Sequence, residues 1–402
     1  MSTRRVQCGI AGGGPAGMML GYLLARAGVE VVVLEKHADF LRDFRGDTVH
    51  PSTLEVMYEL GLLESFLQRP HQEVRELAAQ IGDTTVTIAD FSHLPTHCKF
   101  VALMPQWEFL DFLATEGRRF PGFHLLMQTE AVAPLVEDGR IVGVDATSPA
   151  GPLRIRAPLI VACDGRYSTM RDRAGLASTN LGSPMDVLWM RLGKRADDPQ
   201  RTFGRIRAGQ IFVTLDRGDY WQCALVIPKG GIDRVRARGL PALRATIVAV
   251  APFFADRVDA LASWDDIKLL TVIVDRLRQW WRPGFLCIGD AAHAMSPIGG
   301  VGINLAIQDA VAAANLLSAP LADGTVSDDD LRRVQRRREW PTRATQRGQL
   351  LAQDHVVGRV LGNSRQALPW PVKCLARFPV LRRLPARVVG VGVRPEHVRQ
   401  PQ

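Results

Sequence analysis

Apolar runs near the start of the chain alternate with a glycine-rich turn and a helical stretch. Residues 6–11 form a short, mostly apolar run that predicts a buried strand, and three glycines follow it. Residues 15–27 have helical spacing and end at Gly28, and residues 30–34 are rich in β-branched side chains, which favours a second strand. A strand–turn–helix–strand unit of this length indicates a parallel sheet with a right-handed crossover.

Further along the chain, helical and alternating segments follow each other. Residues 131–162 predict a β-meander with a tight turn at Asp138-Gly139. The pattern changes from about residue 186 to 274, where the runs at 211–215 and 220–227 flank a turn at 216–219 and predict an antiparallel sheet. A short apolar strand at 285–288 and a long helix at 301–317 return to the first pattern. We therefore predict an α/β fold, in which a Rossmann-like domain with a parallel sheet carries an inserted antiparallel-sheet domain and a helical, basic C-terminus. The other expected elements are a hairpin within 74–91 and helices at 51–60, 106–117, 241–254 and 331–351.

Charge is unevenly distributed along the 402 residues. Lys and Arg number 50 and Asp and Glu 41, a net charge of +9. Residues 331–402 hold 16 Lys and Arg against 3 Asp and Glu, so this segment carries +13 and the rest of the chain −4. The sequence therefore predicts no nucleic-acid partner, and it leaves the basic segment able to contact a membrane, an acidic partner or the protein's own body.

Six cysteines and one long uncharged stretch bear on the compartment. No cysteine lies within four residues of another, so neither a disulfide framework nor a C-x-x-C zinc site is predicted. Residues 6–25 lack charge, but they include six glycines and Pro15, which a signal peptide or membrane span does not need. We predict a reduced, cytoplasmic protein. The four prolines at 369, 371, 379 and 385 interrupt any long amphipathic helix, which favours docking of the C-terminus onto the body over membrane contact.

The glycine-rich turn has the spacing of a dinucleotide-binding loop. Gly12, Gly14 and Gly17 form a G-x-G-x-x-G pattern between a predicted strand and a predicted helix. The glycines allow a tight turn and a close approach of the backbone to a pyrophosphate, and the helix N-terminus offers N–H donors to it. Glu35 follows the second strand, where a carboxylate accepts hydrogen bonds from ribose hydroxyls. These features predict dinucleotide binding without separating FAD from NAD.

Two later loops carry similar signals. Gly289-Asp290 follows the strand at 285–288, and residues 297–304 (P-I-G-G-V-G-I-N) lead into the long helix. An Asp at the carboxyl end of a parallel strand lies where ligands bind, and the glycines leave room for a flat ring whose negative charge the helix N-terminus stabilises. Asp164-Gly165 also follows an apolar strand, and Ser168 is placed to cap the next helix.

Together, the three segments resemble the fingerprints of FAD-dependent aromatic hydroxylases of the para-hydroxybenzoate hydroxylase type, the class A flavoprotein monooxygenases. They are G-x-G-x-x-G at 12–17, D-G-x-x-S-x-x-R at 164–171 and G-D-x-x-H…P-x-x-G-x-G-x-N at 289–304. The resemblance covers about residues 5–350 and implies that FAD is the cofactor.

The resemblance also implies a set of cofactor-binding residues. It places Glu35 at the adenosine ribose, Asp164 at the pyrophosphate side, Asp290 at the ribityl–pyrophosphate region and residues 297–304 along the isoalloxazine. Weaker correspondences place Arg45 beside the flavin, Gln106 near the ribityl chain and Val132 at the adenine. The full predicted set is Gly12, Gly14, Pro15, Ala16, Gly17, Glu35, Lys36, Arg45, Gln106, Val132, Asp164, Gly289, Asp290, Pro297, Gly300, Gly302, Ile303 and Asn304.

The family further implies the reaction. NAD(P)H is the expected co-substrate that reduces FAD, and the reduced flavin activates O₂ as a C4a-hydroperoxide to hydroxylate an electron-rich, aromatic or polyketide-like small molecule. The alternatives are an FAD-dependent dehydrogenase or reductase without oxygen insertion, and a catalytically silent flavin-binding protein. The predicted domains are 1–70, 98–178 and 276–320 for FAD binding, 71–97 and 179–275 for the substrate, and 321–402 for the basic helical C-terminal region.

We predict neither a metal site nor a general base. His93 and His97 flank Pro95, which breaks the helix that a metal pair at this spacing requires. His293 is expected to be structural, and His50 is the candidate best placed to approach the flavin ring, although an uninvolved position is expected for it. Core packing is expected for at least two of three aromatic residues in the substrate sheet, Trp189, Tyr220 and Trp221.

Overall fold

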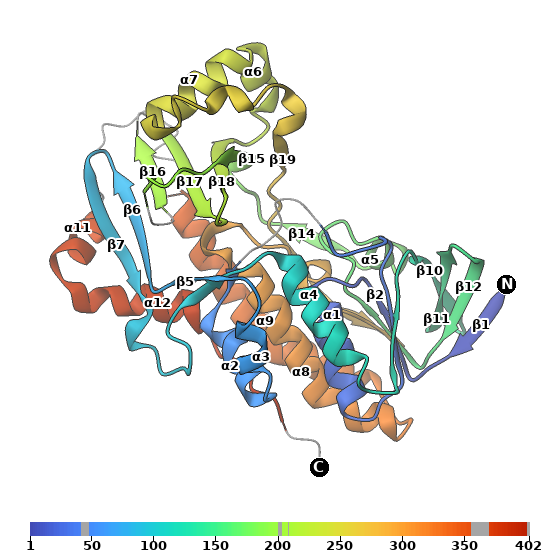
Figure 1. The fold of residues 1–402 in the computed structure, drawn as a ribbon. Coiled ribbons are helices and arrows are strands. Elements are labelled where there is room, and N and C mark those ends of the chain that lie inside the picture. Colours follow the sequence, from blue (N-terminus) through green and yellow to red (C-terminus); the bar gives the residue numbers. More distant parts are fainter. Residues whose placement is uncertain (42–47, 200–202, 208, 355–369, 400–402) are drawn as a thin grey trace.

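The computed structural model describes residues 1–402 except 42–47, 200–202, 208, 355–369 and 400–402. Figure 1 shows two main bodies, one built on a parallel sheet with long helices and one on a twisted antiparallel sheet capped by short helices. The fold is therefore mixed α/β, with parallel and antiparallel sheets as predicted.

A mainly parallel sheet forms the centre of the first body. Within the described residues its order is β21-β22-β13-β2-β3-β9, and all neighbours are parallel except the edge pair β21–β22. The strands are β2 (Cys8–Ala11), β3 (Val31–Leu34), β9 (Phe123–Leu126), β13 (Leu159–Ala162), β21 (Trp281–Arg282) and β22 (Phe285–Cys287).

Neighbouring residues of β2 show what covers each face of this sheet. Ile10 packs under α1, because its methyl groups approach Gly17 and Gly21, whereas Gly9 faces Ile155 on the other side. Helices therefore cover one face and a second sheet covers the other. The helices of this body are α1 (Pro15–Arg26), α2 (Pro51–Glu59), α3 (Leu63–Leu67), α4 (Gln106–Gly117), α5 (Thr169–Arg173) and α8 (Gly302–Ala322).

The covering sheet is the predicted meander with one addition. Its order is β1-β12-β11-β10, with β10 (Glu130–Glu137), β11 (Arg140–Ser148) and β12 (Gly151–Arg156) antiparallel. β1 (Ser2–Arg5) joins in parallel beside β12. The sequence did not predict β1 because its side chains are polar and carry no alternation.

A seven-stranded sheet forms the second body. Its order is β19-β15-β18-β17-β16-β6-β7, so the hairpin β6–β7 completes a sheet whose other strands come more than 90 residues later. The strands are β6 (Glu76–Ile81), β7 (Thr84–Asp90), β15 (Met185–Gly193), β16 (Phe203–Arg207), β17 (Gln210–Asp216), β18 (Tyr220–Pro228) and β19 (Lys268–Leu270).

The two faces of this sheet have different neighbours. One face packs under α7 (Leu240–Val250) through residues such as Phe212 and Trp221. The other face carries a cluster that includes Val187 and Val226 and that packs with Ile298 of the first body. The predicted helix at 241–254 ends at Val250, because Pro252 begins a separate 3₁₀ turn. The other short elements are α6 (Ile232–Ala237), η2 (Pro252–Phe254), η3 (Val258–Ala260) and η4 (Trp264–Asp266).

Small sheets connect the two bodies. They are the sheet β4-β8-β5, from β4 (Thr48–Val49), β5 (Gln72–Val74) and β8 (Val101–Leu103), and the pair β14 (Ser178–Asn180) with β20 (Asp275–Leu277). The domain boundaries proposed from the sequence remain predictions. The boundary at residue 320 falls inside α8, which continues to Ala322. The remaining 3₁₀ turns of this region are η1 (Phe91–His93), η5 (Gly289–Ala291) and η6 (Ile298–Gly300).

The C-terminal region is helical and returns to the body. α9 (Asp328–Ala352) starts with a capping box between Ser327 and Asp330. After the undescribed residues come α11 (Trp370–Arg377), η8 (Pro379–Arg382) and α12 (Arg383–Gly390). The prolines separate these helices, and Pro385 lies in the first turn of α12, where it leaves no hydrogen bond unmade.

Candidate functional site

The three sequence fingerprints converge at one edge of the parallel sheet. β22, β13 and β2 are neighbours and run parallel, so their carboxyl ends and the loops that follow lie together. A Cβ atom placed on Gly12 would lie 2.5 Å from the Cys163 carbonyl oxygen. Arg166 Nη2 lies 3.5 Å from Asp290 Oδ2, across 124 residues of chain. The loops therefore contact each other directly.

The glycine loop presents the start of α1 to this edge. Gly14 is the N-cap, no side chain caps the helix, and Pro15 occupies its first turn. Gly17 must be glycine, because an added Cβ would lie 2.0 Å from the Gly12 carbonyl oxygen. At Gly14, in contrast, an added Cβ would meet no atom within 4 Å. The helix start thus offers N–H donors to an open space, as an anion site requires.

Glu35 joins the glycine loop to the end of β3. Its Oε2 accepts a hydrogen bond from the Gly13 N–H at 3.0 Å, and its Oε1 accepts one from the His37 N–H at 3.0 Å. The side chain is buried, whereas the neighbouring Lys36 is exposed. The carboxylate is therefore fixed at the rim of the space in front of Gly14.

A second glycine loop leads into α8. Gly300 has φ +63° and lies against Thr48, whose Oγ1 donates to the Gly300 carbonyl oxygen at 2.9 Å. An added Cβ at Gly300 would lie 2.3 Å from that same Oγ1, so only glycine fits. α8 begins at Gly302 without a capping side chain and without an acidic residue in its first turn. No side chain of the first turn of α8 therefore neutralises its positive end.

The Asn304 side chain holds this loop in place through hydrogen bonds to the segment around His50. Its Oδ1 accepts hydrogen bonds from the His50 N–H at 3.0 Å and from Thr53 Oγ1 at 2.7 Å. Asn304 thereby ties the start of α8 to the segment between β4 and α2. Its side chain positions the loop, and Ile303 beside it is half-buried.

His50 is a fully buried side chain behind the same loop. Its Nδ1 lies 2.7 Å from the Val389 carbonyl oxygen, which can only accept, so Nδ1 carries the proton. Its Nε2 has no hydrogen-bond partner among the described residues. Burial lowers the pKa of His50 to about 4, although the hydrogen bond to Val389 acts in the opposite direction.

The low pKa of His50 predicts a pH-dependent stability. The unfolded chain binds a proton at this residue below its ordinary pKa of 6.5, and the native protein only below about 4. Stability is therefore complete above pH 6.5 and falls as the pH drops toward 4, by about 3 kcal/mol from this group. A His50→Asn variant, which keeps a donor to Val389, should lack this component in urea unfolding at pH 7.5 and 4.5. If the free energy of unfolding fell equally in both proteins between pH 7.5 and 4.5, the low pKa of His50 would be contradicted.

The second fingerprint, at 164–171, joins the loop after β13 to α5 and to the third fingerprint through hydrogen bonds. Asp164 is largely buried and accepts hydrogen bonds from Ser168 Oγ and from the Met170 N–H. Burial raises the pKa of Asp164, and these hydrogen bonds act against that rise. Ser168 caps α5 as predicted, accepting from the Arg171 N–H at 2.9 Å. The buried Arg171 reaches the Ala291 carbonyl oxygen at 3.5 Å, which connects this loop to the third fingerprint.

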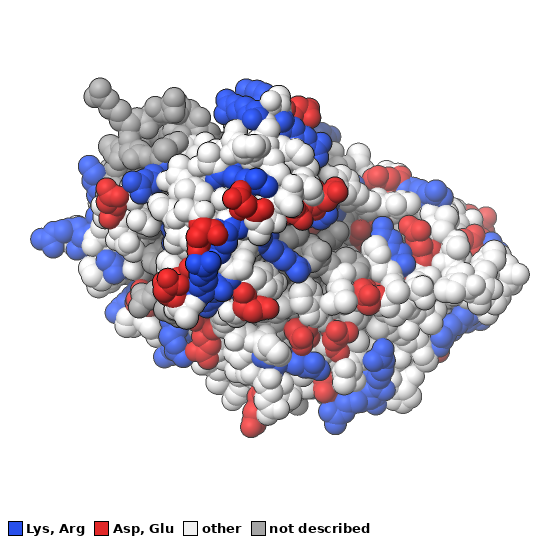
Figure 2. Space-filling view, turned by 45° about the horizontal axis from the view of Figure 1, so that its top comes forward, with Lys and Arg blue, Asp and Glu red and all other residues white. Residues whose placement is uncertain are grey.

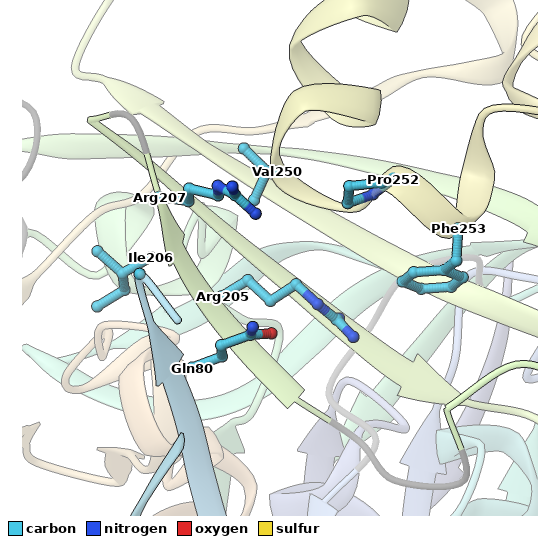
Figure 3. Close-up of a pocket in the computed structure, with 8 residues that line it drawn as sticks. Gln80, Arg205, Ile206, Arg207, Val250, Pro252 and Phe253 are labelled. Atoms are coloured by element: carbon cyan, nitrogen blue, oxygen red, sulfur yellow. The ribbon is translucent and has the colours of Figure 1, made fainter. Parts of the chain in front are cut away.

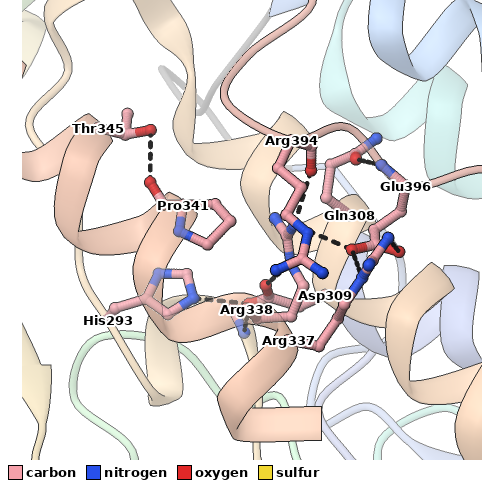
Figure 4. Close-up of polar contacts among 10 residues, drawn as sticks. His293, Gln308, Asp309, Arg337, Arg338, Pro341, Thr345, Arg394 and Glu396 are labelled. Atoms are coloured by element: carbon pink, nitrogen blue, oxygen red, sulfur yellow. Dashed lines mark hydrogen bonds and ion pairs between the residues drawn. The ribbon is translucent and has the colours of Figure 1, made fainter.

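The third fingerprint rests on a buried ionic network, shown in Figure 4. Asp309 Oδ2 accepts hydrogen bonds from His293 Nε2 at 2.6 Å and from the Gly289 N–H at 3.1 Å. Arg338 Nε of α9 donates to Asp309 Oδ1 at 2.9 Å. Burial alone would raise the pKa of Asp309, but the His293 and Arg338 side chains together hold it below its ordinary value. His293 thus has the structural place expected for it.

The same network reaches the C-terminal segment. Arg338 Nη1 lies 3.4 Å from Glu396 Oε1, and Arg337 holds the Glu396 carboxylate with two hydrogen bonds of 2.7 and 3.1 Å. Sequence reasoning missed Asp309 and Arg338. A signal existed for Asp309, because an Asp among the alanines of an apolar helix is rarely buried without a partner.

Two of the three weaker predicted residues belong to described elements. Gln106 begins α4, three residues after β8, which pairs with β4 beside the Gly300 loop. Val132 lies at a register shift in β10, between Ala131 and Ala133, so it falls outside the regular pairing with β11. Arg45 lies outside the described residues.

The three aromatic residues of the seven-stranded sheet for which core packing was predicted differ in their surroundings. Trp221 is fully buried under α7, and its Nε1 donates to Asp198 Oδ2 at 2.8 Å. Tyr220 is half-buried with the Arg191 guanidinium 5.0 Å from its ring centroid. Trp189 packs against the apolar cluster on the face that meets Ile298. Trp221 is therefore a core residue, and Trp189, which is partly buried, packs against the apolar cluster that also contacts Ile298.

A separate cavity of about 240 Å³ opens on the other face of the same sheet (Figure 3). Arg205, Arg207 and Gln80 line it from the strands, and Phe253 lines it from the segment after α7. This cavity lies across the sheet from Ile298, so it does not belong to the converging loops.

Neither a strongly charged surface patch on the face in Figure 2 nor a metal site among the described residues suggests a functional site other than the converging loops. Figure 2 shows basic and acidic side chains interspersed on the face that it presents, without a field of one sign. Among the residues that the structure describes, no three His, Cys, Asp or Glu side chains are grouped as a metal site. Ile298–Ala322 is long and apolar enough to span a bilayer, but 67% of its apolar window is buried inside the protein, as in a core helix.

Comparisons with known proteins agree with this geometry. A family model described as an FAD binding domain matches residues 5–347. The chain belongs to this FAD-dependent aromatic hydroxylase family. The enzyme is an FAD-dependent monooxygenase, and FAD is its cofactor.

Relatives of the monooxygenase include enzymes from Streptomyces. It is 34% identical over 384 residues to 6-methylpretetramide 4-monooxygenase of Streptomyces rimosus, covering 94% of this chain and 91% of that protein. It is 31% identical over 313 residues to rifampicin monooxygenase of Streptomyces venezuelae, covering 75% of this chain but only 61% of that protein. The fold matches the solved structure of the OxyS anhydrotetracycline hydroxylase from Streptomyces rimosus, with a TM-score of 0.78 at 24% identity over 96% of this chain and 76% of that one.

Proposed function

We propose that the monooxygenase hydroxylates an electron-rich aromatic or polyketide-like small molecule, with NAD(P)H as the reductant. The apolar face of the seven-stranded sheet, packed with Ile298 next to the Gly299-Gly300 loop, carries this proposal. A flat apolar substrate between that face and the loop would be held away from water. The names of the relatives, which refer to 6-methylpretetramide and anhydrotetracycline, support a fused-ring substrate.

FAD fits the converging loops on three observations. The open space at Gly14 and the uncapped start of α1 suit the pyrophosphate, with Pro15, Ala16 and Gly17 in the first turn. Glu35 stands where the adenosine ribose is expected, and the register shift at Val132 leaves backbone groups outside regular strand pairing, as an adenine contact needs. The uncapped start of α8 suits a ring that gains negative charge on reduction.

The remaining predicted residues complete the proposed binding site. Asp290 and Asp164 support the ribityl and pyrophosphate region, with Gln106 nearby. The ring would lie against the loop at Pro297, Gly300, Gly302, Ile303 and Asn304, and the resemblance implies supporting roles for Gly289, Lys36 and Arg45. Bound FAD supplies the redox chemistry, so this chain has to bind it, orient it and exclude water. We propose no catalytic base, and the six free cysteines fit a reducing, cytoplasmic location.

A turnover experiment under labelled oxygen tests this function. The purified protein should contain FAD, and a fused-ring phenol should stimulate its oxidation of NADH or NADPH. Under ¹⁸O₂ the product should gain one labelled oxygen atom per turnover. The control is the same assay with a substrate of equal size that lacks an electron-rich ring. Substrate-stimulated NAD(P)H consumption with an unlabelled, dehydrogenated product would instead show a flavin dehydrogenase or reductase.

A further inference from the structure

The C-terminal helices expose an unusually apolar surface. Leu381, Leu384 and Val388 recur at helical spacing from η8 into α12, and Phe378 and Val380 precede them at the start of η8. We call these five residues the C-terminal patch. Their exposed fractions are 54%, 66%, 45%, 69% and 49%, which is far more than large apolar side chains usually keep.

Basic residues surround the C-terminal patch. Residues 370–393 contain no Asp or Glu. Within the described residues, no salt bridge joins the cations of this segment to a carboxylate, but Arg383 Nη2 lies 3.3 Å from His93 Nε2, so Arg383 is partly engaged by the body. Arg382 instead donates to the Leu375 and Ala376 carbonyl oxygens, which ties α11 to η8. The cations are Lys373, Arg377, Arg382, Arg383 and Arg387.

The opposite side of α12 is firmly docked. Ala386 and Gly390 are buried, and a Cβ atom placed on Gly390 would lie 2.8 Å from Leu94 Cδ1 and 3.2 Å from Phe91 Cδ1. This confirms that the C-terminus docks onto the body, as the prolines indicated. The patch is therefore the outer side of a packed helix and not a loose tail, and Figure 1 shows α11 and α12 at the outer rim of the molecule.

We propose that the C-terminal patch is a peripheral binding surface for an anionic lipid bilayer. Apolar side chains enter the region between headgroups and acyl chains, and flanking arginines reach anionic headgroups. A second copy of the chain is a poorer occupant, because a symmetric contact would bring five cations against five. The rim position favours a flat partner over a peptide that needs a groove.

Val389, which follows the patch residue Val388, contacts the loop at 297–304 and the His50 side chain behind it. The Val389 carbonyl oxygen accepts the His50 Nδ1–H, and Val389 Cγ2 lies 3.9 Å from a Cβ atom placed on Gly299. A bilayer bound at α12 would thus lie directly behind the loop at 297–304. This arrangement would bring the enzyme to hydrophobic substrates that partition into membranes, but the binding itself does not depend on the proposed reaction.

Vesicle co-sedimentation of the full chain tests the surface. We expect binding to vesicles of phosphatidylcholine with about a third phosphatidylglycerol, little binding to pure phosphatidylcholine, and weaker binding at high salt. The double variant Arg383→Gln/Arg387→Gln should bind about thirtyfold more weakly, since each arginine near the surface contributes about fivefold. Leu384→Gln should also weaken binding, by about tenfold.

Matched variants control for general effects. Leu351 and Arg332 are exposed on α9, so Leu351→Gln and Arg332→Gln should leave binding unchanged. All variants should keep their FAD content and melting temperature, because the altered side chains are at the surface. Equal sedimentation of wild type and patch variants would overturn the proposal. A patch-dependent dimer, or capture only by an acidic protein, without vesicle binding would overturn it as well.

Discussion

A Gly14→Asp variant is expected to fold normally but to lose FAD. The backbone at Gly14 is extended, with φ −75° and ψ −176°, and an added Cβ meets no atom within 4 Å. Asp is a favourable N-cap next to the positive end of α1, so the free energy of unfolding should rise by up to about 1 kcal/mol. The same carboxylate would face the pyrophosphate. Two unit charges 4 Å apart near a protein surface repel by about 4 kcal/mol, which weakens binding about a thousandfold.

The measurements are FAD content after purification, the Kd of added FAD, and the melting temperature of the apo protein. Gly14→Asn is the matched control, because it has the same shape without the charge and should lose much less affinity. If Gly14→Asp retained FAD as the wild type does, the pyrophosphate could not lie at the start of α1. If both variants failed to fold, the conclusion that a side chain fits at position 14 would be wrong.

An Asp309→Asn variant is expected to lose about 3–5 kcal/mol of stability. Asp309 is the carboxylate partner of the buried Arg338, and its Oδ2 also receives His293 and the Gly289 N–H. Removing its charge leaves the buried Arg338 with Glu396, at 3.4 Å, as its remaining carboxylate partner among the described residues. The effect should appear as a lower midpoint of urea unfolding at pH 7, together with weaker FAD binding, because Gly289 belongs to the converging loops.

Two comparison variants separate this effect from an ordinary loss of charge. Glu73→Gln breaks the exposed pair between Glu73 and Arg75 and should cost less than about 1 kcal/mol. Asp309→Asn combined with Arg338→Met removes both charges and should recover part of the loss. A cost for Asp309→Asn as small as that for Glu73→Gln would mean that the network does not hold the loop.

Local patterns predicted the elements well because their signals are short-range. The helix Gln106–Gly117 agrees with its prediction at both ends, and the glycine turn, β2 and α1 lie where their spacing placed them. The pairing of β6 with β16 had no such signal, since nothing in a strand's own sequence names a partner more than 120 residues away. β1 was missed because its polar side chains carry no alternation.

The candidate site was predictable only in part. The three fingerprints showed which loops belong together, but not that Arg166 and Asp290 or Gly12 and Cys163 contact each other. Arg338 lies within a run of arginines that suggests a solvated face. Its spacing of four from the buried Val334 was the available clue that it faces inward. The contact between His50 and Val389 could not be predicted, because it depends on a helix that returns after more than 330 residues.

The parallel pairing of β6 with β16 also has a consequence for biosynthesis. When the ribosome has made the hairpin β6–β7, the edge of β6 waits unpaired until residues 203–207 emerge. Such an open edge invites association between nascent chains, and sheets with distant pairings form slowly. Production of this enzyme should therefore gain from chaperones that cover the edge of β6 until residues 203–207 have been made.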